Sequence, residues 1–174
     1  MLVPPLEGIA QINNGQFSEG ISSLRRGIER WISLGGHLLN PYLKSFIAEA
    51  MAFEGDVEGA LHVIEECLQQ IERQGWEERV HLAEVLRLKG WILARQNRLK
   101  EAERELYASL KWARQQQAKS WELRTSITLA QVLARSGKRV SALETLSTVY
   151  DWFSQGFATR DLREAKALLE ELGY

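Results

Sequence analysis

Apolar residues recur at intervals of three and four along the chain, and no stretch alternates as a half-buried strand would. Segment 139–154 shows the pattern clearly, because its apolar residues fall on one face of a helix. They are Val140, Leu143, Leu146, Val149, Tyr150 and Phe153. The pattern predicts an all-α chain, with helices near residues 4–14, 17–34, 41–54, 57–74, 77–96, 99–116, 120–136, 139–154 and 161–172.

A few residues mark where these helices are expected to begin. Asn40 followed by Pro41 is typical of a helix start, since Asn caps the first turn and Pro fits the first helical position. Ser120 and Asp161 are the expected N-caps of two later helices. Glu164 lies three residues after Asp161, which is the spacing of a capping box.

Four segments share one order of residue types. Each has a small residue, a turn residue seven positions later and a second small residue five positions after that. Counted from this second small residue, an aliphatic residue follows four positions later and a small or β-branched residue seven positions later. The sets are Gly8, Gly15, Phe17, Gly20, Leu24 and Gly27; Ala48, Gly55, Val57, Ala60, Ile64 and Cys67; Gly90, Asn97, Leu99, Ala102, Leu106 and Ser109; and Ala130, Gly137, Arg139, Ala142, Leu146 and Val149.

This order of residues predicts a helical hairpin. The two small residues let antiparallel helices approach closely, and Gly or Asn between them supplies the left-handed residue that ends a helix. The aliphatic residue fills the seam, because it lies on the same helical face as the small residue four positions before it. One hairpin cannot bury its apolar side alone, so the hairpins must stack.

The repeat resembles the tetratricopeptide repeat (TPR) family over roughly residues 4–152. Its period of 40 to 42 residues exceeds the family's usual 34, as longer helices would require. The resemblance implies a right-handed α-solenoid of about four hairpins in a single domain, residues 1–174. The expected hairpins are 4–34, 41–74, 77–116 and 120–154, followed by a C-terminal capping helix at 161–172.

The pattern of residues 161–172 predicts that capping helix. One apolar stripe lies along an otherwise charged helix, and the end of a solenoid needs such a cap to stay soluble. The stripe consists of Leu162, Ala165, Leu168, Leu169 and Leu172. We expect Trp152, Phe153 and Phe157 to pack under the cap.

The amino-acid sequence of this tail is similar to the C-terminal sequence of large bacterial regulators. The resemblance rests on Phe153, Gly156 and Phe157, and on the run from Thr159 to Leu172. In those regulators a cyclase or transcription-factor module and an ATPase module precede a terminal TPR array. The resemblance implies that this chain is the regulatory TPR region of a bacterial signalling protein, either a fragment or a stand-alone relative.

Charge is nearly balanced overall but unevenly distributed. Twenty-two basic and 23 acidic side chains leave a net charge of −1, which argues against direct nucleic-acid binding. Residues 1–87 hold 7 basic and 13 acidic side chains (net −6), and residues 88–174 hold 15 and 10 (net +5). The asymmetry would steer a partner or favour head-to-tail self-contact, or it is an incidental property of solvated helix faces.

The compartment and membrane status follow from what the sequence lacks. No apolar run approaches the length of a membrane span, and the N-terminal residues do not have the form of a signal peptide. A single cysteine, Cys67, excludes an internal disulfide framework. We expect a cytoplasmic protein with no membrane contact. Cys67 is expected to be a buried, inert thiol, with a redox switch as the alternative.

We predict no catalytic residue, metal or cofactor. The sequence contains neither a phosphate-binding Gly-x-x-x-x-Gly-Lys-Ser/Thr loop nor a Gly-x-Ser-x-Gly nucleophile elbow. His37, His62 and His81 are far apart in sequence, and none has a second His or Cys at helical ligand spacing. The chain is therefore expected not to be an enzyme.

The TPR resemblance implies that the inner helix of each hairpin lines a concave groove. The groove residues it implies are Asn13, Tyr42, Glu49, Arg87, Trp91, Arg95, Arg124, Gln131 and Arg135. Arg87, Trp91 and Arg95 follow at intervals of four and form one stripe. Such a stripe suits an acidic peptide or a carboxylate, while the alternative is that the arginines solvate the helix and pair with glutamates.

The leading hypothesis is a non-catalytic protein–protein interaction module or scaffold. Its partner would be a protein or peptide, or another domain of the same parent protein. The alternative is a ligand-sensing or autoinhibitory domain of an adenylate/guanylate cyclase or of an ATPase-type transcription regulator. The apolar first hairpin would also support a homodimer.

Overall fold

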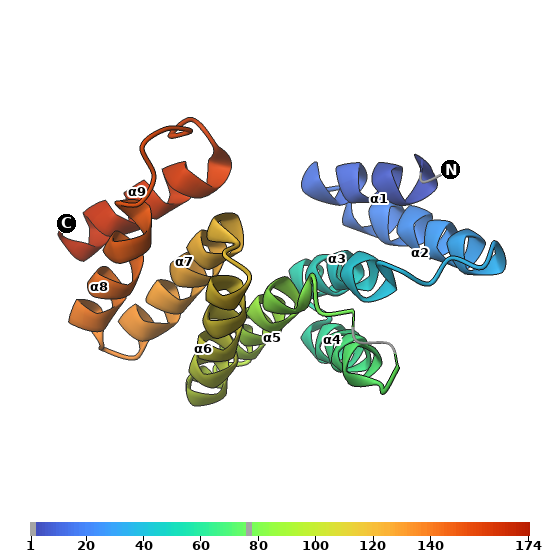
Figure 1. Cartoon of the computed structure of the whole chain (residues 1–174), viewed down its shortest axis with the longest axis horizontal. Helices are drawn as coiled ribbons and strands as arrows, with labels where there is room; N and C mark the ends of the chain where they lie inside the picture. The colour runs from blue at the N-terminus through green and yellow to red at the C-terminus, as the bar shows by residue number, and fades with distance from the viewer. Residues whose placement is uncertain (1–2, 76–77) are drawn as a thin grey trace. The chain divides into compact units, whose positions relative to one another are not determined.

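The computed structural model describes residues 3–75 and 78–174, and regular structure in these ranges is α-helical throughout (Figure 1). The prediction of an all-α chain is confirmed. The chain divides into two compact units, residues 1–88 and 89–174, with the division inside one helix. No described helix is both long and apolar enough to cross a bilayer.

Unit 1 is built from consecutive antiparallel helices. Helix α1 packs against α2, α2 against α3, and α3 against α4, so that each helix meets the next one along the chain. The apolar core of the first three helices includes Ile12, Leu24 and Ile47. The bounds are Val3–Asn13 for α1, Phe17–Ser33 for α2, Asn40–Phe53 for α3 and Val57–Glu72 for α4; α5, Leu82–Arg95, begins in this unit.

Unit 2 continues the hairpins and adds the terminal helix. Helix α6 packs against α7 and α7 against α8, while α9 packs against both α7 and α8. The bounds are Leu99–Gln115 for α6, Lys119–Arg135 for α7, Arg139–Tyr150 for α8 and Arg160–Leu172 for α9.

The small residues of the repeat lie where helices approach closely, as predicted. A Cβ atom added to Gly8 would lie 2.8 Å from the backbone nitrogen of Leu24 and 2.9 Å from the carbonyl oxygen of Gly20. Added to Gly90, it would lie 2.5 Å from Cγ of Leu106. Real Cβ atoms do not tolerate such distances, so glycine fixes the spacing of these helices.

The turn residues of the repeat are all left-handed. The φ angles are 80° at Gly15, 98° at Gly55, 60° at Asn97 and 76° at Gly137. Each residue follows the C-terminal end of the first helix of a hairpin and lets the chain reverse. The spacing of seven from small residue to turn residue therefore predicted the hairpin turns correctly.

Gly137→Ala is expected to lower the free energy of unfolding by about 1 kcal/mol, because a left-handed φ strains an L side chain. No atom lies within 4 Å of the added Cβ, so the change reports the backbone alone. Gly137→Asn should cost less, since Asn97 holds the same conformation in the preceding hairpin. Urea unfolding of both variants measures the difference, and equal losses would contradict the interpretation.

Two predicted N-caps, Asn40 and Ser120, are wrong although the helix starts lie within one residue of the prediction, and one predicted start is wrong by five residues. Helix α3 begins at Asn40, and its N-cap position is held by Leu39 in a left-handed conformation with φ 68°. Helix α7 begins at Lys119, so Ser120 lies inside it. Helix α5 begins at Leu82 instead of near 77; residues 78–81 are not helical, and residue 77 lies outside the described residues.

The capping box predicted at the last helix is also wrong. Helix α9 begins at Arg160, and Thr159 holds the N-cap position without a side-chain cap. The Asp161 carboxylate instead accepts a hydrogen bond from Nε of Arg124 at 2.7 Å, which ties α9 to α7. A tertiary ion pair has replaced the local cap, because a charged partner on α7 is within reach.

Four of the five residues of the apolar stripe of α9 are buried, and Leu168 is half-buried, but Trp152 and Phe157 do not lie where they were expected. Leu162, Ala165, Leu169 and Leu172 are buried. Trp152 is 59% exposed and Phe157 45% exposed, so neither is buried beneath the cap. Trp152 instead meets the ring of Phe153 edge-on, and Nζ of Lys119 lies 5.4 Å from its ring centre.

Helices α6 and α7 are joined by a charged cluster around Glu122. This carboxylate is 4% exposed and accepts hydrogen bonds from Nε of Arg114 at 2.8 Å and Nζ of Lys119 at 2.6 Å. Burial alone would raise the pKa of Glu122, but the two cationic donors outweigh it and hold the pKa below its ordinary value of 4.5.

Glu122→Gln is expected to destabilise the fold near neutral pH and to matter less in acid. A carboxyl with a lowered folded-state pKa stabilises the native state above its unfolded pKa, and this contribution is lost as pH falls through the folded value. The gap in unfolding free energy between wild type and Glu122→Gln should therefore be widest above about pH 5 and narrow below 4.5. A gap that does not change with pH would contradict the assignment.

Candidate functional site

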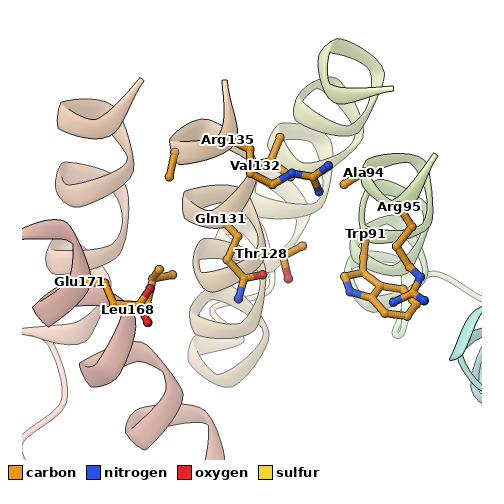
Figure 2. A pocket seen from close by; sticks show the side chains of 10 residues that line it. Trp91, Ala94, Arg95, Thr128, Gln131, Val132, Arg135, Leu168 and Glu171 are labelled. Atoms are coloured by element: carbon orange, nitrogen blue, oxygen red, sulfur yellow. The ribbon is translucent and has the colours of Figure 1, made fainter. Parts of the chain in front are cut away.

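A pocket of about 460 Å³ lies in unit 2, between the end of α5, the C-terminal half of α7 and the end of α9 (Figure 2). Its walls combine small apolar residues, one indole, two guanidinium groups and one carboxylate. The lining residues are Trp91, Ala94, Arg95, Thr128, Gln131, Val132, Ala134, Arg135, Leu168 and Glu171. The volume suits one or two side chains of a bound peptide, or a small molecule.

Helix α5 supplies an aromatic wall that carries a positive charge. Trp91 and Arg95 are four residues apart and so share one helical face. The guanidinium carbon of Arg95 lies 5.0 Å from the centre of the Trp91 ring, within the range of a cation–π interaction. Buried Ile92 and Leu93 hold this turn of the helix in the core. The indole is thus fixed as a flat, half-buried surface beside a cation.

Helix α7 supplies the base of the pocket. Val132 and Thr128 are 2% and 5% exposed and form its inner surface. Gln131 lies beside them and donates from Nε2 to Oε1 of Glu164 on α9 at 3.5 Å, a long hydrogen bond that a ligand could displace. Arg135 is exposed at the rim, and it forms no ion pair with any residue in the described ranges. Its guanidinium is available to an anion.

Helix α9 closes the remaining side. Leu168 contributes apolar surface, and Glu171 places a carboxylate across the pocket from Trp91 (Figure 2). Arg139 of α8 donates a hydrogen bond to the backbone carbonyl of Glu171, which fixes the end of α9. The pocket therefore has an apolar base, cations at the α5 and α7 sides and an acceptor at the α9 side.

Four of the nine predicted groove residues line this pocket: Trp91, Arg95, Gln131 and Arg135. The other five lie outside it. Arg124, on α7, is bound to Asp161. Asn13, Tyr42, Glu49 and Arg87 belong to unit 1.

Arg87 is not an open cation. Its side chain is 12% exposed and contacts two carboxylates, Glu84 at 2.7 Å and Glu49 at 3.9 Å. Two carboxylates around one guanidinium leave no positive charge for an acidic ligand. Arg87 therefore pairs with glutamates, which is the alternative interpretation of this stripe.

The remaining predicted residues of unit 1 form a local cluster or stand alone. The ring of Tyr42 stacks on His81 with a centroid distance of 4.0 Å. Burial lowers the pKa of His81 below 6.5, although the carboxylates of Glu78 and Glu84 oppose that shift. Asn13 is exposed at the end of α1.

Sequence reasoning missed the contribution of α9. Leu168 and Glu171 line the pocket, whereas the sequence predicts only a capping role for α9. The intervals from Leu168 to Glu171 and from Thr128 to Gln131 place each pair on one helical face. That signal identifies a shared face but not which helix it meets, so the pocket could not be assembled from it.

The described part of the chain holds no cluster of three His, Cys, Asp or Glu side chains able to hold a metal ion. Cys67 is fully buried, as predicted, and burial raises the pKa of its thiol to about 12. The thiol is therefore protonated and unreactive at neutral pH.

Comparison with known proteins places the fold but not a sequence family. No protein-family model matches the chain, and no curated protein sequence matches it. The solved structure of the nearly identical TPR-like repeats of a protein assigned as a kinesin light chain of Podosopora anserina is similar, with a TM-score of 0.71 at 15% identity. The similarity covers 98% of this chain and 83% of that one. A single-substitution variant of the same protein has a TM-score of 0.73.

A second similar structure is the MamA RS-1 ArsTM double mutant. Its TM-score is 0.55 at 15% identity, over 95% of this chain and 89% of that chain. These likenesses, together with the repeated hairpins, define a TPR-like repeat fold.

Proposed function

We propose that this chain is a non-catalytic interaction module that binds a peptide segment of a partner protein in the pocket of unit 2. The observation that carries the proposal is the exposed cation Arg135 beside the Trp91–Arg95 pair, around an apolar base. Aromatic and arginine side chains in a partly desolvated pocket are the usual anchors of protein recognition. The four pocket residues anticipated from the sequence supply most of this chemistry.

The pocket lining supports a particular chemistry for the bound segment. A carboxylate of the partner would pair with Arg135 and with the guanidinium of Arg95, while a large apolar side chain would cover Trp91 and Val132. Glu171 on the opposite wall would accept a hydrogen bond from a backbone or side-chain donor of the same segment. We therefore propose an acidic segment that carries a large apolar residue next to an Asp or Glu.

Selection from a random peptide library displayed on phage tests this proposal. Enriched peptides should carry an acidic residue adjacent to Phe, Leu, Ile, Met or Trp, and synthetic peptides of those sequences should bind the isolated chain. The same peptides with Asp and Glu exchanged for Lys are the matched control. Enrichment of basic peptides, or of none, would contradict the proposal.

We also propose a regulatory role within a bacterial signalling protein, supported by the tail from Phe153 to Leu172. The alternative is a ligand-sensing or autoinhibitory domain, and its sensing form is supported by the pocket volume of about 460 Å³, which suits a small molecule as well as peptide side chains. Titration of the isolated chain with a panel of small carboxylates, read by heteronuclear NMR, separates the two. Shifts of the Trp91 indole signal with small acids favour sensing, and shifts with peptides alone favour protein binding.

A further inference from the structure

Helix α6 carries a basic face on its solvent side. Its buried side includes Ala102, Leu106 and Ser109, and the residues opposite them are exposed and positively charged. This α6 face consists of Lys100, Arg104, Tyr107, Lys111 and Arg114. Tyr107 is 46% exposed and lies in the middle of it.

The cations of the α6 face are costly within a single chain. Like charges four residues apart on a helix destabilise it, as for Lys100 with Arg104. Arg104 and Arg114 contact carboxylates, Glu105 at 2.9 Å and Glu122 at 2.8 Å. Lys100 and Lys111 form no ion pair with any residue that the structure describes. The face therefore holds positive charge that the chain itself does not neutralise.

Helix α4 carries an acidic face at the equivalent positions of the preceding hairpin. Glu58, Glu65 and Glu72 follow at intervals of seven and are all exposed. They lie opposite the buried side formed by Ala60 and Ile64. None of the three carboxylates has an ion-pair partner in the described ranges.

We propose that the α6 face of one copy of this chain docks on the α4 face of a second copy. The spacings match: acidic residues recur every seven residues on α4, or about 10.5 Å, and Lys100, Tyr107 and Arg114 recur at the same interval on α6. Glu58 and Glu72 then each lie beside two cations, and Glu65 lies beside the Tyr107 hydroxyl, which donates to it. This pairing of α4 carboxylates with the α6 face is possible whether the two helices run parallel or antiparallel, because it is symmetric about Tyr107.

The net charges of the two units favour the same contact. Unit 1, which holds α4, carries −6, and unit 2, which holds α6, carries +5. Unit 1 of one copy and unit 2 of another therefore attract each other, because their net charges are opposite in sign, while two copies of the same unit repel. Each chain offers one face of each sign, so the contact either closes between two copies or adds further copies.

Sedimentation velocity of the whole chain at several concentrations tests the proposal. At about 0.01 M salt the weight-average mass should rise with concentration, and at about 1 M salt it should return to the monomer, because screening removes contacts between exposed charges. A chain that stays monomeric at low salt overturns the proposal. Self-association that strengthens with salt overturns it as well, since that behaviour marks apolar contacts.

Charge exchange identifies the two faces. Lys100→Glu with Lys111→Glu should weaken self-association about tenfold or more, as should Glu58→Lys with Glu65→Lys. Mixing the two double variants should restore association, because the acidic α6 face of one then meets the basic α4 face of the other. The matched control for the α6 variant is Arg163→Glu with Lys166→Glu on the exposed side of α9, which changes net charge by the same amount and should weaken association much less than the α6 variant.

Circular dichroism is the check that each variant is folded, and the exposed positions make folding of all of them the expected result. Two double variants that fail to associate when mixed would overturn the pairing of α4 with α6. This test is independent of the peptide pocket: Arg135→Ala should leave self-association unchanged, and the charge-exchanged faces should leave peptide binding unchanged.

Discussion

Leu106→Ala is expected to lower the free energy of unfolding by about 2–5 kcal/mol, because it leaves a cavity where α5 and α6 approach closely. Leu106 is fully buried, and its Cγ lies 2.5 Å from where a Cβ on Gly90 would be. Gly90→Ala alone should also destabilise the fold, by about 1–3 kcal/mol, through overpacking. Urea unfolding monitored by circular dichroism measures both.

The combination of the two changes is the decisive measurement. In the Leu106→Ala background the methyl group of Gly90→Ala enters the vacated space, and alanine favours the helix by about 1 kcal/mol. The second substitution should therefore be neutral or stabilising there, although it destabilises the wild type. Leu146→Ala, at the equivalent position of the fourth hairpin, is the control, and with it the effect of Gly90→Ala should be additive. Additivity in both backgrounds would contradict close packing of Gly90 on Leu106.

The hairpins could be predicted from the sequence because their determinants are local. A small residue and a turn residue seven positions apart specify both a close approach and its reversal, and Asn97 substitutes for glycine by adopting φ 60°. Helix starts were predicted less well. Asp161 is of a residue type that favours the N-cap position, but its carboxylate accepts a hydrogen bond from Arg124 at 2.7 Å. A sequence does not show which distant partner competes for a carboxylate.

The candidate site shows the same limit. The interval of four between Trp91 and Arg95 predicted a shared face, and the structure places both in one pocket. Arg87 belongs to the same stripe by spacing, yet Glu84 and Glu49 neutralise it. Glu84, at 2.7 Å, is three residues away on the same helix, but Glu49, at 3.9 Å, lies on α3 and is nearly forty residues away in sequence. Helical spacing identifies which residues share a face, while tertiary packing decides which charges stay available.

Trp91→Ala is expected to weaken binding of a selected acidic peptide by about thirtyfold or more, corresponding to about 2 kcal/mol or more for a central aromatic anchor. The substitution removes the flat apolar wall and also the ring that holds the Arg95 guanidinium 5.0 Å from its centre. Isothermal titration calorimetry with the peptide measures the loss. Trp152→Ala is the matched control, because Trp152 is 59% exposed and does not line the pocket.

Arg135→Ala separates recognition of charge from recognition of apolar surface. It should weaken binding of the acidic peptide, but not of the same peptide with its Asp and Glu replaced by Asn and Gln, because Arg135 contributes mainly through the carboxylate. The salt dependence of binding should fall in parallel, since one screened charge contact is lost. Arg163→Ala, exposed on α9 away from the lining residues, should change neither quantity. Equal losses for the acidic and neutral peptides would mean that Arg135 shapes the pocket without reading the charge of its ligand.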